Sequence, residues 1–311
     1  MKPIVTLTMN PSIDVAWEVD DMVPIRKLRS SPGRPDPGGG GINASRVIHE
    51  LGGPTLAIYL AGNLTGEFLR KRLEDWAFDR RLIHIEGYTR VSAIAYERST
   101  GQEYRIVPPG PEVTESEWQA AVDVLDEVDA DWLVLTGSLP RQVPADFYGR
   151  IARRAKEHGI KVVLDTSGRP LFEALQEGVH LVKPNRRELE NLLGRKAPER
   201  DDQEALCRQL IDEGRAEMVA LSLGAEGALM VWRDGSRFLE SPKVEVKSAV
   251  GAGDSFVGAL TLGLAQNRPI DDAFALAVAT GAATVLTAGT ELCHRADVDR
   301  LYAQIRSEQF A

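Results

Sequence analysis

The chain has 311 residues, enough for one large α/β domain or two smaller ones, and its 43% apolar residues can fill a sizeable core. Its formal net charge of −9 argues against a nucleic-acid-binding surface, although a few local cations can still hold a phosphorylated metabolite. The two cysteines, Cys207 and Cys293, lack paired spacing, so we expect a reducing, cytoplasmic compartment and neither a disulfide framework nor a zinc site.

Short apolar, β-branched runs alternate with helical periodicity along most of the chain. The first run turns polar too soon for a secretory leader, and no run approaches the roughly 18 residues of a membrane span, so we expect no membrane partner. Strands are predicted at 4–8, 56–60, 132–136, 162–165, 180–182, 218–223 and 228–232. Helices are predicted at 43–51, 66–76, 115–127, 145–158, 186–193, 202–213, 254–266, 271–286 and 296–308. This alternation favours a mostly parallel sheet covered on both faces, with ligands beyond the carboxyl ends of its strands.

Two segments, 11–37 and 88–107, lack helical period and partly alternate between apolar and polar residues. They suggest a small β lid over a site. An isolated small sheet is marginal in water, so we expect a homodimer joined through this lid. The alternative is that these strands merely extend the main sheet.

The most informative stretch is 246–256, in which Gly251, Ala252 and Gly253 directly precede Asp254 and an amphipathic, small-residue segment. The free backbone N–H groups of a helix that starts here would face a turn with little side-chain bulk, which is typical of an anion or phosphoryl site. The Asp254 carboxylate can then take a proton from an attacking hydroxyl. The alternative is an ordinary turn with a helix cap.

A second glycine cluster lies far upstream, where residues 38–41 are all glycine and Asn43 follows at the start of a helical run. Consecutive glycines let a ligand approach the main chain closely. The alternatives are a flexible linker for the glycines and a helix cap for Asn43.

Several side chains are candidates for holding a phosphorylated sugar. Lys27 and Arg29 have alternating spacing on the first lid segment, and Arg90 begins the second, so three cations can face one phosphate. The two on the first segment can equally belong to a solvated charge run. Asp14 can accept hydrogen bonds from sugar hydroxyls, or it is only a turn residue after Pro11.

A third cluster follows the strand at 180–182, where Lys183 and Pro184 lead to Asn185 and, one turn on, Glu188. The spacing matches a capping box, which is the favoured interpretation. The functional alternative is that Asn185 and Glu188 help to hold a hydrated Mg²⁺ near nucleotide phosphates.

Taken together, these motifs resemble those of the PfkB (ribokinase-like) family of carbohydrate kinases, over essentially the whole chain. Five segments carry the resemblance in order: 38–43, 136–140, 183–188, 222–227 and 250–255. The family implies one three-layer α/β/α domain over 1–311, with a mostly parallel central sheet and a small β-sheet lid. It also implies ATP and Mg²⁺ as cofactors, with K⁺ as a further candidate.

Residue roles follow from the same resemblance. The catalytic group would be Asp254 with the turn Gly251, Ala252 and Gly253. The sugar phosphate would contact Asp14, Lys27, Arg29, Gly38, Gly39, Asn43, Arg90 and Ser138. The nucleotide would contact Lys183, Asn185, Ser222, Gly224, Gly227, Ser248, Val250, Gly251, Gly253, Gly281 and Thr284. Glu188 would hold Mg²⁺ through water, and Ser248, Val250, Thr287 and Gly289 would surround K⁺.

Within the family, the chain looks most like the 6-phosphofructokinase branch, which phosphorylates the C1 hydroxyl of fructose 6-phosphate. Gly40 stands where the 1-phosphofructokinase and tagatose-6-phosphate kinase branches usually place lysine. Those branches remain alternatives, as does an idle sugar-phosphate sensor. Thr287 and Glu291 differ from the Asn and Arg expected in the 6-phosphofructokinase branch, and Ser248 and Ala249 replace a common Asp-Thr pair, which puts potassium activation in doubt.

Overall fold

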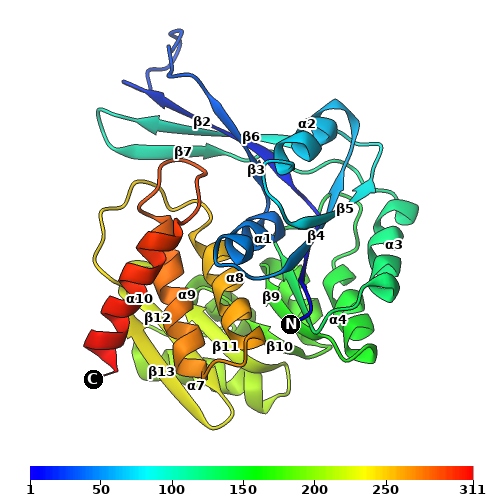
Figure 1. Cartoon of the computed structure of the whole chain (residues 1–311), viewed down its shortest axis with the longest axis vertical. Helices are drawn as coiled ribbons and strands as arrows, with labels where there is room; N and C mark the ends of the chain where they lie inside the picture. The colour runs from blue at the N-terminus through cyan, green and yellow to red at the C-terminus, as the bar shows by residue number, and fades with distance from the viewer. Residues whose placement is uncertain (311) are drawn as a thin grey trace.

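The computed structural model describes residues 1–310, in which a large sheet lies between two layers of helices and a smaller sheet stands apart from it (Figure 1). The nine strands of the main sheet follow the order β13-β12-β11-β10-β9-β8-β1-β4-β5 within these residues. Their bounds are β1 Ile4–Thr8, β4 Thr55–Ala61, β5 Asp79–His84, β8 Trp132–Thr136, β9 Lys161–Asp165, β10 Val179–Val182, β11 Ala216–Ser222, β12 Gly227–Trp232 and β13 Gly235–Glu240. All neighbours are parallel except the pairs β11–β12 and β12–β13. The predicted mostly parallel, ribokinase-like sheet is confirmed.

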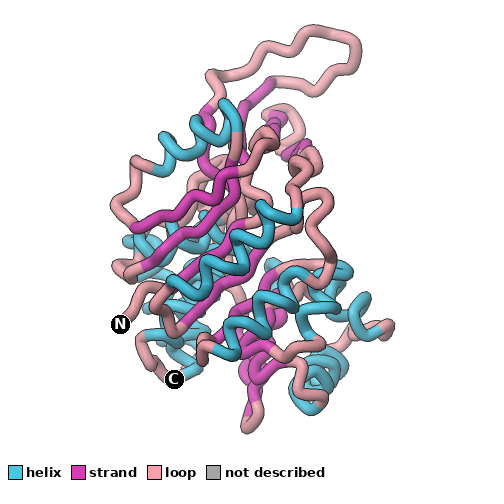
Figure 2. The backbone as a smooth tube through the Cα atoms, turned by 90° about the vertical axis from the view of Figure 1, so that its right-hand side faces the viewer, coloured by secondary structure: helices cyan, strands magenta, loops and turns pink. Residues whose placement is uncertain are grey.

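Helices cover both faces of this sheet (Figure 2). One face carries α1 (Gly40–Glu50), α2 (Asn63–Leu73), α8 (Ala252–Ala265), α9 (Ile270–Thr284) and α10 (Arg295–Gln309). The other carries α3 (Glu115–Asp123), α4 (Phe147–Glu157), α5 (Gly168–Leu175), α6 (Arg186–Leu193) and α7 (Arg200–Asp212). Because side chains alternate along a strand, Val134 packs toward α8 while its neighbours Leu133 and Leu135 pack toward the second layer. Every helix within residues 1–310 is too short or too polar to cross a lipid bilayer.

The smaller sheet has the strand order β3-β2-β6-β7, with β2 at Ser12–Val19, β3 at Arg34–Gly38, β6 at Arg90–Glu97 and β7 at Gln102–Ile106. It is the expected lid sheet, so the alternative that these strands extend the main sheet is wrong. Residues 20–33 form a long loop between β2 and β3, which Figure 1 shows as the blue excursion beyond the lid strands. The expectation that Lys27 and Arg29 share one side of a strand is therefore wrong.

Other departures from the predicted elements have local causes. Strands β5 and β13 were not predicted because they are the two edges of the main sheet and carry charged residues, as edge strands often do. Helix α5 was not predicted because Gly168 and Pro170 are typical of a loop, although a first helical turn tolerates proline. The predicted helix 115–127 ends at Asp123 and continues as a 3₁₀ turn, Val124–Glu127. Helices α1 and α8 begin three and two residues before their predicted starts of 43 and 254.

Candidate active site

The N-termini of two helices meet at the carboxyl edge of the main sheet. Helix α8 begins after Gly251, whose φ of 75° is a conformation that favours glycine, and Asp254 is its third residue. A Cβ atom at Gly40, the first residue of α1, would lie 3.0 Å from Asp254 Oδ1 and 2.3 Å from Thr136 Oγ1. Both glycine clusters therefore surround the same carboxylate, and the linker alternative for residues 38–41 is wrong.

Asp254 and Asn43 bind each other across this junction. Asn43 Nδ2 donates a hydrogen bond to Asp254 Oδ2 at 2.9 Å. Helix α8 has no side-chain cap hydrogen bond at its N-cap, and Asn43 is the fourth residue of α1 rather than its cap. Neither residue is thus the simple helix cap that the sequence left open.

Burial is the main cause that raises the pKa of Asp254, to about 6. The neighbouring charge of Asp165 raises it further, whereas the hydrogen bond from Asn43 and the charge of Lys183 lower it. A carboxyl group with this pKa is ionised at neutral pH but is a much better proton acceptor than an exposed aspartate.

Lys183 and Asp165 form an ion pair with 3.1 Å between Nζ and Oδ1. Burial disfavours the ammonium ion, but the charge and hydrogen bond of Asp165 outweigh it and raise the pKa of Lys183. A Cβ atom at Gly253 would lie 3.7 Å from Lys183 Nζ, so the lysine faces the turn before Asp254. The sequence placed Asp165 at a strand end without a role. Its position as the last residue of a buried, β-branched strand was the signal available.

The candidate sugar-binding residues gather on the lid side of Asp254. Ser12 Oγ donates to Asp14 Oδ1 at 2.6 Å, and a Cβ atom at Gly38 would lie 2.1 Å from Asp14 Oδ2. The pKa of Asp14 is raised, chiefly by burial. Gly39, with φ 114°, precedes α1, and a Cβ atom there would lie 2.7 Å from Thr8 Cγ2. Asp14 is therefore a half-buried strand carboxylate beside the glycine turn rather than an exposed turn residue.

Arg90 and Ser138 are tied to the loop after β1. Arg90 Nη2 donates to the carbonyl oxygen of Asn10 at 2.8 Å, and Asn10 Nδ2 donates to Ser138 Oγ at 3.1 Å. The Nε atom of Arg90 is buried without a hydrogen-bond partner among the described residues. Lys27 and Arg29, by contrast, are exposed on the 20–33 loop.

A cavity of about 600 Å³ opens on the far side of Gly253. Its lining includes seven of the residues expected to contact a nucleotide: Lys183, Asn185, Ser222, Gly224, Gly227, Gly253 and Gly281. Apolar walls come from Val244, Phe256 and Val285. Thr284, Ser248, Val250 and Gly251 do not line it. Thr284 Oγ1 donates to its own helix at Thr280, and Ser248 Oγ donates to Glu103 Oε2 of the lid at 2.9 Å.

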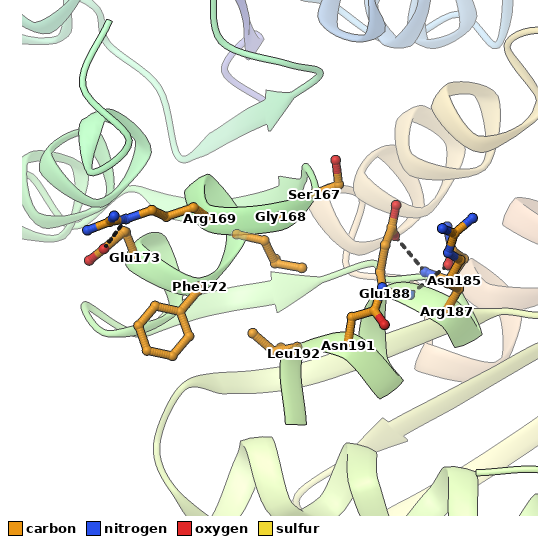
Figure 3. A pocket seen from close by; sticks show the side chains of 11 residues that line it. Ser167, Gly168, Arg169, Phe172, Glu173, Asn185, Arg187, Glu188, Asn191 and Leu192 are labelled. Carbon is orange, nitrogen blue, oxygen red and sulfur yellow. Dashed lines mark hydrogen bonds and ion pairs between the residues drawn. The ribbon is translucent and has the colours of Figure 1, made fainter. Parts of the chain in front are cut away.

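A second hollow of about 660 Å³ lies between α5 and α6 and shares Asn185 with the first (Figure 3). Asn185 N donates to Glu188 Oε2, and Glu188 N donates to Asn185 Oδ1, both at 2.9 Å. This is the predicted capping box. Burial raises the pKa of Glu188. The Glu188 carboxylate thus caps the N-terminus of α6 beside Asn185, which lines both cavities.

The four residues expected around K⁺ come from two loops. Ser248 and Val250 precede α8, whereas Thr287 and Gly289 follow α9. Thr287 Oγ1 contacts the carbonyl oxygens of Thr284 and Glu291 at 2.7 and 2.6 Å. A Cβ atom at Gly289 would lie 3.0 Å from Ala16 Cβ of the lid. Within residues 1–310, no three His, Cys, Asp or Glu side chains converge as they would around a metal ion.

Comparison with known proteins decides the family. The family model described as "pfkB family carbohydrate kinase" matches residues 8–297. The chain belongs to this family. It is accordingly a PfkB-family sugar-phosphate kinase, a phosphotransferase with an alcohol acceptor that is similar to 6-phosphofructokinases.

Relatives of this PfkB-family kinase match over nearly its full length. It is 41% identical over 301 residues to the ATP-dependent 6-phosphofructokinase isozyme 2 of Mycobacterium tuberculosis, covering 96% of this chain and 88% of that protein. The crystal structure of phosphofructokinase-2 from Escherichia coli in complex with fructose-6-phosphate has a TM-score of 0.93 and 36% identity, covering 98% and 99% of the two chains. The structure of the same E. coli protein in complex with potassium has a TM-score of 0.94, 37% identity and the same coverage.

Proposed function

We propose that this kinase transfers the γ-phosphoryl group of ATP to the C1 hydroxyl of fructose 6-phosphate and produces fructose 1,6-bisphosphate. The observation that carries this proposal is the position of Asp254. Its carboxylate lies where the N-termini of α1 and α8 meet, between the candidate sugar residues and the cavity beside Lys183. The relatives named above are 6-phosphofructokinases, and one was solved with fructose-6-phosphate.

In the proposed reaction, Asp254 accepts the proton of the C1 hydroxyl as that oxygen attacks the γ-phosphorus. The bond between the γ-phosphorus and the β,γ-bridging oxygen breaks, and ADP leaves. The free N–H groups at the start of α8 face the transferred group and stabilise its charge. Asn43 holds the carboxylate, and Asp14 accepts hydrogen bonds from the sugar hydroxyls.

ATP would occupy the 600 Å³ cavity with its phosphates toward Gly253. Lys183 fits this role because an ammonium group has three donors and Asp165 takes one, which leaves two for phosphate oxygens. Glu188 fits an outer-sphere role toward Mg²⁺, which keeps most of its waters in nucleotide sites and needs few protein ligands. When bound, Mg²⁺ neutralises charge on the β- and γ-phosphates.

The 6-phosphate would be held by Arg90, whose buried Nε has no partner among the described residues. Lys27 and Arg29 would join it when the 20–33 loop folds over the sugar. Closure would also exclude water, which otherwise hydrolyses ATP.

We also propose a homodimer through the lid, which the exposed apolar face of the lid sheet supports. Because Ala93 pairs with Ile106 and Ala95 with Tyr104, these side chains share one face of the sheet with Val91. Val91, Tyr104 and Ile106 are 43%, 37% and 67% exposed. An Ile106→Glu variant should turn a dimer into a monomer in light scattering, and a wild-type protein that is monomeric at micromolar concentration contradicts the dimer.

Ser248 and Thr287 each donate their hydroxyl proton within the protein, which leaves a lone pair on each oxygen for K⁺. Backbone carbonyls near Val250 and Gly289 would complete the proposed site. The test replaces KCl with NaCl at constant ionic strength, and equal rates remove the ion from the mechanism.

The substrate is tested by ADP release from MgATP with one acceptor at a time: fructose 6-phosphate, tagatose 6-phosphate, fructose 1-phosphate, fructose and ribose. A kcat/KM preference for fructose 6-phosphate supports the proposal. A preference for tagatose 6-phosphate or fructose 1-phosphate moves the chain to another branch of the family. A preference for an unphosphorylated sugar overturns the role of Arg90, and no turnover with any of them favours the sensor alternative.

A further inference from the structure

Arg46 is a buried cation without an ion pair among residues 1–310. It lies on α1, one turn after Asn43, and is only 6% exposed. Its Nη1 atom donates to the carbonyl oxygen of Pro37 at 3.1 Å and to Asn43 Oδ1 at 3.3 Å. Its guanidinium carbon lies 4.6 Å from the ring centroid of Trp76, and its Nε has no hydrogen-bond partner in the described part of the chain. Burying a charge in this way is costly.

The contacts of Arg46 decide which way the Asn43 amide faces. An asparagine amide has an oxygen and a nitrogen end of nearly equal size, and only the nitrogen end can donate to a carboxylate. In the reversed orientation, the amide oxygen would face Asp254 Oδ2, and two acceptors would oppose each other at 2.9 Å. Arginine is a hydrogen-bond donor only, so a guanidinium on the other side of the amide can bind only the amide oxygen.

We propose that Arg46 is a positioning residue that fixes the Asn43 amide so that its N–H group points at Asp254. This inference rests on the proposed function, in which Asp254 is the general base. The hydrogen bonds run from Arg46 through one amide to the carboxylate, and all three side chains lie at the junction of α1 and α8. Arg46 also holds Pro37, directly before the glycine turn, through the same Nη1 atom.

Other charged groups surround both ends of this chain of hydrogen bonds. Asp254 is faced by Asp165 of β9, Lys183 after β10 and Asp14 of β2. Arg46 is faced by Asp36 and Arg34 of β3, Asp14 of β2 and Cys293. Burial lowers the pKa of Arg46 to about 10, so it stays charged throughout the pH range in which Asp254 titrates. A change in the titration of Asp254 on replacing Arg46 therefore does not come from titration of Arg46.

The first test replaces Arg46 by Met, which keeps much of the length but has no donor. The acid limb of kcat/KM against pH should move up by roughly 0.5 pH unit or more, because Asp254 loses a fixed hydrogen-bond donor. Turnover should fall by about 10-fold or more, with less than about a 2-fold change in KM for ATP, since Arg46 does not line the nucleotide cavity. Arg46→Lys should recover only part of the loss.

The matched control is Arg80→Met. Arg80 also donates to backbone carbonyls, those of Leu73 and Trp76, and lies near the same tryptophan, but it has no bond to Asn43. It should leave the acid limb in place. A wild-type acid limb in Arg46→Met overturns the inference, as does an equal movement in Arg80→Met.

A double-mutant cycle separates positioning from a direct field effect. If Arg46 acts through the amide, Arg46→Met should move the acid limb no further in an Asn43→Ala background. An equal movement in both backgrounds overturns the inference.

A readout without turnover keeps the inference distinct from the proposed function. The difference in unfolding free energy between proteins with Asp254 and with Asp254→Asn, followed from pH 4 to 8, reports the titration of Asp254. Arg46→Met should move its midpoint upward, and an unmoved midpoint overturns the inference. Failure of the proposed function would instead appear as full turnover in Asp254→Asn.

Discussion

Lys183 and Asp165 form a largely buried ion pair at the carboxyl ends of the neighbouring strands β10 and β9, with 3.1 Å between Nζ and Oδ1. Asp254 stands close enough that Asp165 raises its pKa while Lys183 lowers it. The positive charge of Lys183 therefore offsets the repulsion between the carboxylates of Asp165 and Asp254.

Replacing Lys183 by Met should leave Asp165 buried without its partner and cost about 3 kcal/mol or more in unfolding free energy. KM for ATP should rise far more than KM for the sugar, because the lysine faces Gly253 and the cavity that we propose holds ATP. Urea unfolding and initial rates measure the two effects. Lys161→Met, at the opposite end of β9, is the control and should change neither the KM for ATP nor the KM for the sugar. Equal effects on both substrates in Lys183→Met would argue against the nucleotide assignment.

Asp254→Asn should lower turnover by about 10²–10⁴-fold with little loss of substrate binding, because the amide keeps the shape but cannot take a proton. In the wild type, kcat/KM should fall as the pH drops through about 6, the pKa to which burial raises this group. Rates from pH 5 to 9 in correctly folded protein test both statements. Near-normal turnover in the variant would remove Asp254 from the base role.

The same variant should be more stable than the wild type at neutral pH. Because the folded-state pKa of Asp254 is raised from about 3.8 to about 6, its contribution to stability is present below pH 4 and is lost as the pH rises through 6. Above pH 6, Asp254→Asn should gain about 1–3 kcal/mol, and the two proteins should converge near pH 4. Unfolding free energies at pH 4 and pH 8 measure this difference. A variant that is no more stable at pH 8 contradicts the raised pKa.

Arg90→Ala should raise KM for fructose 6-phosphate far more than KM for ATP, because Arg90 binds Asn10 in the region that we propose holds the sugar phosphate. Its effect should shrink with unphosphorylated fructose as acceptor. Arg98→Ala, just after the same strand, removes an exposed cation paired with Glu18 and Asp20 and should leave both KM values unchanged. If Arg90→Ala affects both substrates equally, Arg90 does not hold the sugar phosphate.

Two glycine substitutions should separate stability from chemistry in the turn before Asp254. Gly251→Ala should destabilise the fold by about 1–2 kcal/mol, because φ is 75° and a Cβ atom would lie 2.5 Å from Leu292 Cδ2. Gly253→Ala meets only Lys183 Nζ, at 3.7 Å, so its melting temperature should stay the same or rise. Its methyl group would nevertheless cover the surface that we propose faces the phosphates, and kcat/KM for ATP should fall by about 10-fold or more. Wild-type kinetics in Gly253→Ala would mean that the transferred group does not reach this turn.

Much of this fold follows from local patterns. The buried strands 132–136 and 4–8 have the predicted bounds because both faces are covered and their residues are apolar or threonine. Helix α6 also has its predicted bounds, because its capping box and its left-handed Gly194 mark both ends. The edge strands β5 and β13 carry no such signal.

The candidate site was only partly predictable, because its contacts join distant segments. Glycine clusters and strand ends pointed to Asp254, Asn43 and Lys183. They could not show that Asn43 binds Asp254 or that Asp165 pairs with Lys183, since both contacts depend on tertiary packing. Nor could alternation alone reveal that Lys27 and Arg29 lie on a long loop. Arg46 was not predictable as a site residue, because a lone arginine within a helix is usually solvated.

The hydrogen bond between Asn43 and Asp254 joins positions that are 211 residues apart. During synthesis, the first glycine turn leaves the ribosome long before the second, and a nascent chain that ends before α8 has neither the carboxylate nor its anion turn. Under the proposed function, such a chain cannot hydrolyse ATP in the absence of a sugar acceptor. Under the proposed function, phosphoryl transfer therefore requires nearly the whole polypeptide to be translated and α1 and α8 to be packed side by side.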